Sequence, residues 1–114
     1  MPDPADALRA QIRALQAQRR SLESKLMQPQ SMLPASLIER FLRTGDSART
    51  APAYYLSSSE HGRSKLTYVK KEDLAEVRQH CAAYRTFQQN LKEWRQVTAA
   101  LQKQWKQLQQ AQSR

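Results

Sequence analysis

The chain has 114 residues, of which 39% are hydrophobic, and its formal net charge is +9. This length predicts a single domain over 1–114, and the low apolar share predicts a thin core built from extended helices. The positive charge favours a polyanionic partner, with nucleic acid before an anionic membrane surface, over the alternative of a merely solvated basic face.

The sequence also argues against two classes of protein. It has no run of about 18 apolar residues, so we expect no membrane-spanning segment. Since nucleic acid is favoured over a membrane surface, we also expect no membrane partner. Its only cysteine, Cys81, excludes an intrachain disulfide and fits a reducing compartment. We therefore expect a soluble, cytoplasmic protein, which is nucleoid-associated if it binds DNA.

A first helix is expected over residues 4–28. Asp3 is a suitable N-cap, and Pro4 suits the first helical position. Apolar residues then recur with the alternating spacing of a heptad seam: Leu8, Ile12, Leu15, Leu22 and Leu26. Arg19 fills the remaining seam position, where it either extends into solvent or fixes the register. We expect it to extend into solvent.

The middle of the chain, 36–70, predicts a small β unit. The runs 54–56 and 66–69 are rich in β-prone residues and flank a Ser/Glu/His/Gly segment, which is typical of a hairpin. The segment 36–42 is ambiguous, because its apolar spacing fits one helical turn and slightly favours a helix. An isolated hairpin is only marginally stable, so the unit must pack against something else.

A second, longer helix is expected over 71–112, because neither Pro nor Gly interrupts this stretch. Its apolar stripe runs through Leu74, Val77, Cys81, Tyr84, Phe87, Leu91, Trp94, Thr98, Leu101, Trp105 and Leu108. Cys81 on this stripe is interpreted as a small core residue. Because both helices join the same β unit, we expect them to fold back as an antiparallel, coiled-coil-like pair.

The lengths of the two helices predict a homodimer. The first helix spans about 37 Å and the second about 63 Å, so the first should end near Arg95 of the second. The seam beyond that point would be exposed and would mark an interface. The residues assigned to this dimer interface are Trp94, Leu101, Trp105 and Leu108.

Four stretches resemble a family of small uncharacterised bacterial proteins. They are ASLIERFLRTG over 35–45, PAYYLS over 52–57, RSKLTYVKKE over 63–72 and the pair Tyr84–Arg85. The family core reads G-S-L-V-x-R-x-R-R-C-G-K-P-x-C-x-C, followed by a Y-Y-L-S strand, a basic strand ending in Y-V-P and a helix carrying Y-R. The resemblance implies a strand at 36–43 and a three-stranded antiparallel meander with further strands at 53–58 and 65–70. The expected fold is mainly α, with two long antiparallel helices flanking this β insert.

The resemblance also bears on chemistry. The three cysteine positions of the family are occupied here by Thr44, Arg49 and Ala51, so this chain is expected to lack any metal or redox centre held there. Members of the family often lie near recombinase genes of mobile elements, which favours work on DNA.

No catalytic pattern is present in the sequence. The two histidines, His61 and His80, are not accompanied by paired carboxylates, a nucleophile–base pattern, a phosphate-binding loop or metal-ligand spacing. We therefore expect no enzyme activity, no cofactor and no metal.

Basic residues interleaved with tyrosines predict nucleic-acid binding by the β unit. The residues assigned to it are Arg40, Arg43, Arg49, Tyr55, Arg63, Lys65, Tyr68, Lys70 and Lys71. A β-ribbon of this kind can enter a major groove, or its tyrosines can stack on single-stranded bases; duplex DNA is favoured. Because strand residues alternate between faces, we expect one of Tyr54 and Tyr55 to be buried and the other exposed.

Two functions are therefore considered. The first is a dimeric DNA-binding accessory factor of a bacterial mobile element, acting in transposition or recombination with a recombinase or transposase. The second is a coiled-coil adaptor that binds a protein partner and no nucleic acid.

Overall fold

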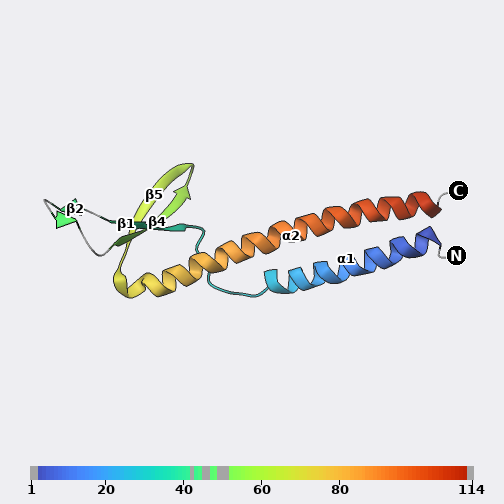
Figure 1. Ribbon diagram of the computed structural model, residues 1–114, viewed down its shortest axis with the longest axis horizontal. Coiled ribbons are helices and arrows are strands. Elements are labelled where there is room, and N and C mark those ends of the chain that lie inside the picture. The colour runs from blue at the N-terminus through green and yellow to red at the C-terminus, as the bar shows by residue number, and fades with distance from the viewer. Residues whose placement is uncertain (1–2, 42, 45–46, 49–51, 113–114) are drawn as a thin grey trace. The chain divides into compact units, whose positions relative to one another are not determined.

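The computed structural model describes residues 3–41, 43–44, 47–48 and 52–112 (Figure 1). Its elements in chain order are α1 (Pro4–Leu26), β1 (Ser36–Arg40), β2 (Arg43–Thr44), β3 (Ser47–Ala48), β4 (Ala53–Glu60), β5 (Arg63–Val69), the 3-10 turn η1 (Lys71–Asp73) and α2 (Leu74–Gln112). The predicted combination of two helices, one of them long, with a three-stranded antiparallel sheet is confirmed. No helix in the described ranges is long and apolar enough to span a membrane.

The chain divides into two compact units. The helical unit comprises Met1–Pro29 with Phe87–Arg114, and the sheet unit comprises Gln30–Thr86. α2 contributes its first turns to the sheet unit and the rest to the helical unit. The single domain expected from the length stays a prediction.

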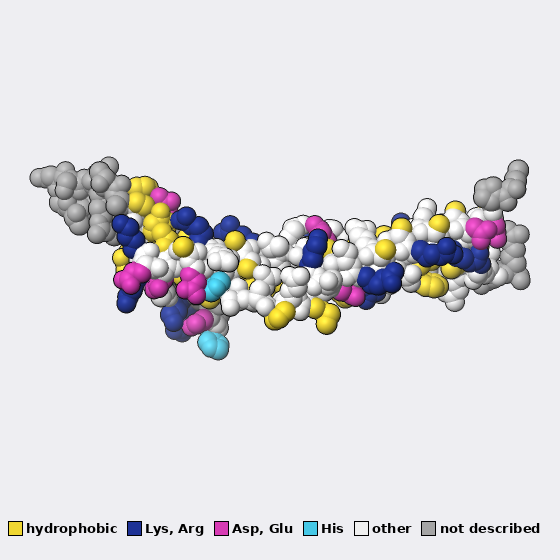
Figure 2. All heavy atoms as spheres, turned by 90° about the horizontal axis from the view of Figure 1, so that it is seen from below, with side chains coloured by type: hydrophobic (Ala, Val, Ile, Leu, Met, Phe, Trp, Pro, Cys, Tyr) yellow, Lys and Arg dark blue, Asp and Glu magenta, His cyan; other side chains and the backbone are white. Residues whose placement is uncertain are grey.

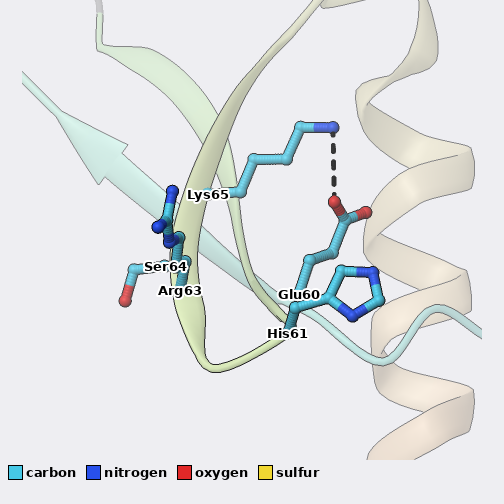
Figure 3. A pocket seen from close by; sticks show the side chains of 5 residues that line it. All are labelled: Glu60, His61, Arg63, Ser64 and Lys65. Carbon is cyan, nitrogen blue, oxygen red and sulfur yellow. Dashed lines mark ion pairs between the residues drawn. The ribbon is translucent and has the colours of Figure 1, made fainter.

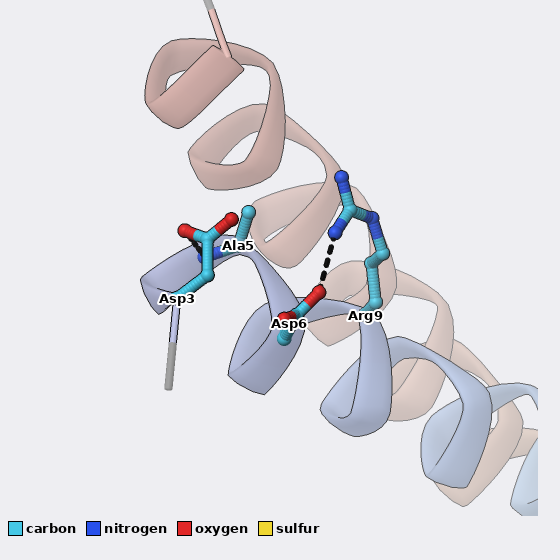
Figure 4. A network of polar contacts seen from close by, with 4 residues as sticks. All are labelled: Asp3, Ala5, Asp6 and Arg9. Carbon is cyan, nitrogen blue, oxygen red and sulfur yellow. Dashed lines mark hydrogen bonds and ion pairs between the residues drawn. The ribbon is translucent and has the colours of Figure 1, made fainter. Parts of the chain in front are cut away.

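The N-terminus of α1 is fixed by the local signals predicted from the sequence. The amide of Ala5 donates to Oδ1 of Asp3 at 3.1 Å, which confirms Asp3 as the N-cap and satisfies one of the free amides of the first turn (Figure 4). Asp6 in the first turn complements the helix dipole and pairs with Arg9 at 2.7 Å. The helix ends at Leu26, two residues before the predicted boundary.

The core of the helical unit is built from both helices. The buried residues are Ala5, Ile12 and Leu22 of α1 with Val97, Leu101 and Leu108 of α2. The predicted stripe passes through Thr98 and Trp105. In the structure, Val97 is the buried residue in place of its neighbour Thr98, and Trp105 is 52% exposed. The buried side of α2 is therefore rotated by one residue from the prediction at these positions, because a bulky aromatic in the sequence does not by itself define the packed face.

The sheet unit contains the meander that the family resemblance implied. Its strand order is β1-β4-β5, and every neighbouring pair is antiparallel. The helical alternative for 36–42 is wrong, because Ser36–Arg40 pairs with β4 as a strand. A second, two-stranded ladder pairs Arg43 with Ala48 and Thr44 with Ser47, so Arg43, the last residue of the expected first strand, belongs to β2 and not to β1.

The sheet unit has few buried residues of its own. Ala53, Val69 and Cys81 are 7%, 6% and 3% exposed. A backbone hydrogen bond of 3.1 Å from the amide of Leu33 to the carbonyl of His80 joins the segment before β1 to α2. The sheet therefore has support from a helix, as the instability of an isolated hairpin requires.

Candidate functional site

The tip of the β4–β5 hairpin brings basic and acidic side chains together. Its turn consists of His61 and Gly62, with φ values of 51° and 77°. Positive φ at both central residues is typical of a type I′ turn, whose twist matches that of the flanking strands. Around it, Glu60, His61, Arg63, Ser64 and Lys65 line an open depression of about 500 Å³ (Figure 3).

The ion pair at the tip is weak. Nζ of Lys65 lies 3.8 Å from Oε2 of Glu60, and the two side chains are 58% and 62% exposed (Figure 3). Exposed pairs of this kind contribute little to stability and are screened by salt. Lys65 is therefore available to an external anion.

The register of the sheet divides its residues between two faces. Directly paired residues share a face, and successive residues alternate. The Tyr68 face comprises Ser36, Ile38, Arg40, Ala53, Tyr55, Ser57, Ser59, Ser64, Leu66 and Tyr68. The Lys65 face comprises Leu37, Glu39, Tyr54, Leu56, Ser58, Glu60, Arg63, Lys65, Thr67 and Val69.

Two tyrosines meet on the Tyr68 face. The rings of Tyr55 and Tyr68 lie 5.8 Å apart, centroid to centroid, with an interplanar angle of 70°. This edge-to-face arrangement is favourable for aromatic pairs. Cζ of Arg40 lies 5.9 Å from the centroid of Tyr55, within the range of a cation–π contact. Tyr68 is 61% exposed and Leu66 is 48% exposed, so this face presents apolar and aromatic surface.

The Lys65 face is partly covered. Val69 is buried, and Cζ of Arg78 in α2 lies 5.7 Å from the ring centroid of Tyr54. Tyr54 and Tyr55 are both half-buried, so the prediction that one would be buried and the other exposed is wrong. Each ring is instead flanked by an arginine on its own face of the sheet.

The residues predicted to bind nucleic acid do not form one patch. Arg40, Tyr55 and Tyr68 lie on the Tyr68 face, whereas Arg63 and Lys65 lie on the Lys65 face. The other four predicted residues are placed as follows: Lys70 and Lys71 are exposed just after β5, Arg43 begins β2, and Arg49 lies outside the described residues. Sequence reasoning missed Leu66, which the alternation with Tyr68 could have identified, and Arg78, for which the sequence gives no signal.

The residues predicted to form a dimer interface have partners within the chain. Leu101 and Leu108 are buried in the cluster shared with α1, and Trp94 packs against it. The expectation that α2 continues beyond α1 at this end is wrong, because Ala5 and Ile12 of α1 belong to the same cluster as Leu108. Only Trp105 among the four remains largely exposed, and the dimer itself stays a prediction.

A polar network beside this cluster explains how a charged residue, Arg19, is accommodated on the apolar seam of α1. Oε1 of Glu23 accepts hydrogen bonds from Nε1 of Trp94 and from Nε of Arg19, both at 3.0 Å. Cζ of Arg19 lies 4.9 Å from the Trp94 ring centroid, so Arg19 does not simply extend into solvent as expected. The hydrogen bond from Trp94 is the largest cause that lowers the pKa of Glu23 from its ordinary value; desolvation opposes it, and the charge of Arg19 and its hydrogen bond lower the pKa further.

The structure adds little in favour of catalysis. His61 is exposed in the hairpin turn, and His80 is half-buried in α2. Among the residues that the structure describes, no group of three or more His, Cys, Asp and Glu side chains could hold a metal ion. Burial raises the pKa of the Cys81 thiol, against a smaller opposing effect of Arg85, which disfavours a reactive thiolate.

Positive charge is unevenly divided between the units. The helical unit has ten Lys and Arg against four Asp and Glu, a net charge of +6. The sheet unit has nine against six, a net charge of +3. The basic side chains occur on both units, and acidic side chains lie beside them in the sheet unit (Figure 2).

Comparison with known proteins gives a family but no characterised relative. The profile described as "Domain of unknown function (DUF6788)" matches residues 12–79, which is more than half of the chain. The matched stretch includes most of α1, the three strands of the meander and the start of α2. No curated protein and no solved structure shows significant similarity to the chain.

Proposed function

We propose that this chain, which belongs to the family of the domain of unknown function DUF6788, is a small nucleic-acid-binding protein that contacts DNA phosphates through its sheet unit. The observation that carries the proposal is the pair Arg63 and Lys65, which are exposed on one face of a tight hairpin. A two-residue turn restrains this hairpin, so the two cations are presented together. Contacts from Lys and Arg to phosphates supply most of the non-specific affinity for nucleic acids.

Glu60 does not cancel this pair of cations. Its contact with Lys65 is long and exposed to solvent, so a phosphate can replace the carboxylate at little cost. The larger net charge of the helical unit would add longer-range attraction for the same polyanion.

We further infer that α1 and α2 form an antiparallel, coiled-coil-like pair and that the protein forms a homodimer through its helical unit. Supporting the pair, Glu23 near the end of α1 bonds to Trp94, whereas Ile12 nearer its start lines a depression with Leu108. Trp105 lines the same depression and is the remaining exposed aromatic for a dimer contact.

The biological setting is proposed from the sequence resemblance. The resemblance noted in the sequence implies a setting near recombinase genes of bacterial mobile elements, and on that basis we propose a DNA-binding accessory factor in recombination or transposition. A recombinase or transposase is then the candidate protein partner, and the cytoplasmic nucleoid is the expected location.

The electrostatic part of the proposal is tested by titrating labelled DNA with the protein at two salt concentrations. If about six phosphates are contacted, affinity should fall roughly a thousandfold between about 50 and 200 mM salt, because the bound counterions are released. An almost flat salt dependence would exclude this mode. The coiled-coil adaptor, which the exposed Trp105 favours, would then be the better function.

A pair of double variants tests the position of the contacts. Arg63→Ala with Lys65→Ala should weaken binding and lower the salt slope by about 2, one for each lost phosphate contact. Lys103→Ala with Lys106→Ala also removes two exposed charges, from α2, and should have the smaller effect. Thermal melts of both variants exclude unfolding as the cause. Equal losses would indicate a diffuse basic field, and a larger loss from the α2 pair would move the binding surface to the helical unit.

A further inference from the structure

The Tyr68 face has a composition unlike that of the opposite face. None of its ten strand residues is acidic, whereas Glu39 and Glu60 both lie on the Lys65 face. Its exposed surface combines Tyr68 and Leu66 with three serines, Ser36, Ser59 and Ser64. An apolar and aromatic surface with hydroxyl groups and no negative charge suits a ligand that has flat rings and a polyanionic backbone.

The tyrosine pair leaves one ring available on this face. Tyr55 is half-buried and is in contact with both Arg40 and Tyr68. Tyr68 lies on β5, an edge strand of the three-stranded sheet, and keeps 61% of its surface exposed. It also lines an open depression of about 420 Å³ together with Lys71. Two cations are thus associated with the tyrosine pair: Arg40 contacts the ring of Tyr55, and Lys71 lines the depression with Tyr68.

From this arrangement we propose that the Tyr68 face binds single-stranded nucleic acid by stacking an unpaired base on Tyr68. Arg40 and Lys71 are positioned to contact the flanking phosphates. The proposal rests on the nucleic-acid-binding function above and adds the form of the ligand. It reverses the preference for duplex DNA that the sequence suggested.

The physical reason is the accessibility of base faces. In a duplex the faces of the bases are stacked on one another, and a protein reads only their edges in the grooves. An aromatic ring on an open sheet can stack only on a base that is unpaired, and sheet-based binding domains use tyrosine and phenylalanine in this way. The exposed ring of Tyr68 would gain nothing from a duplex, whereas the cations of the Lys65 face would bind either form.

The test uses fluorescence anisotropy with the full chain and three nucleic-acid probes of about 12 nucleotides, a length within the range of site sizes of single-strand-binding proteins. The probes are oligothymidylate, the same strand without bases, and a duplex. Oligothymidylate should bind at least about fivefold more tightly than the strand without bases, because each stacked base contributes at least that factor. Tyr68→Leu should remove this difference and leave binding of the other two probes unchanged, and Tyr68→Phe should retain it.

A matched control keeps the result specific. Trp105→Leu removes another exposed aromatic, from the helical unit, and should leave the preference for oligothymidylate intact. If no probe binds at low salt, the proposed function itself fails. If all three bind and Tyr68→Leu has no effect, phosphate binding stands and the stacking proposal is overturned. If Tyr68→Leu alters only the sedimentation of the free protein, the face is a contact between copies of the chain, and the proposal is equally overturned.

Discussion

Leu101→Ala tests whether the seam of α2 is completed within one chain or between two chains. Leu101 is 4% exposed and shares its cluster with residues of α1 from the same chain. Truncating a buried leucine to alanine costs about 2 to 5 kcal/mol, from lost transfer free energy and the cavity left behind. A domain of this size is stable by only about 5 to 15 kcal/mol, so the variant should lose a large fraction of its stability.

The assay is thermal unfolding followed by circular dichroism at two protein concentrations. A loss of about 2 kcal/mol should lower Tm by at least about 8 °C, and this shift should be the same at both concentrations. Trp105→Ala is the matched control, because Trp105 lies on the same helix but is 52% exposed, and it should cost clearly less. The reasoning is refuted if Leu101→Ala melts like the wild type. It is also refuted if the loss disappears at high concentration, because a second chain would then complete the cluster.

Three further predictions concern single residues. Because the pKa of Glu23 is lowered in the folded protein, its ionised form stabilises the fold above the ordinary value of 4.5, and this contribution is lost as pH falls through the folded pKa. Glu23→Gln should therefore flatten the acid side of a stability–pH curve from denaturant unfolding, and an unchanged curve would contradict the role of Trp94. Gly62→Ala should lower the free energy of unfolding by about 1 to 2 kcal/mol, because φ of Gly62 is 77° and an L side chain is strained there, even though no atom lies within 4 Å of the added Cβ. Unchanged stability in a thermal melt would exclude this turn conformation. Cys81 should be alkylated much more slowly in the native protein than in denaturant, because it is buried and its pKa is raised, and equal rates would place it at the surface.

Features set by neighbouring residues were predictable from the sequence. Asp3 and Pro4 begin α1 because capping and a proline at the first position act over one turn. The β-prone runs on either side of the hairpin turn define β4 and β5 for the same reason. The first strand was different, since periodicity within 36–42 favoured a helix and only the family resemblance implied the strand that pairs with β4.

Features that depend on distant residues were not predictable in this way. Which part of α2 faces α1 is fixed by contacts such as Trp94 with Glu23, which are 71 positions apart. The heptad spacing of α1 indicates that this helix packs against another helix, but it does not say which part of α2 it contacts. For that reason the expected overhang beyond Arg95 was wrong, and Leu101 and Leu108, which were assigned to a contact with a second chain, are buried in a cluster with α1 of the same chain.

In the candidate site, too, the arrangement depends on residues that are distant in the sequence, and this affects the function that the site can have. In the sequence, Arg63, Lys65 and Tyr68 lie within six residues of one strand, and together they predict one basic, aromatic patch. Strand alternation separates Tyr68 from the other two, and the register then places Arg40 with Tyr68 and Glu60 with Lys65. The two faces therefore differ in charge balance as well as in aromatic content. A surface that holds phosphates can lie on one face while a surface that stacks bases lies on the other, so the loss of one need not abolish the other. Variants confined to a single face are the appropriate perturbation, because a combined Lys65 and Tyr68 substitution would mix two effects that the fold keeps apart.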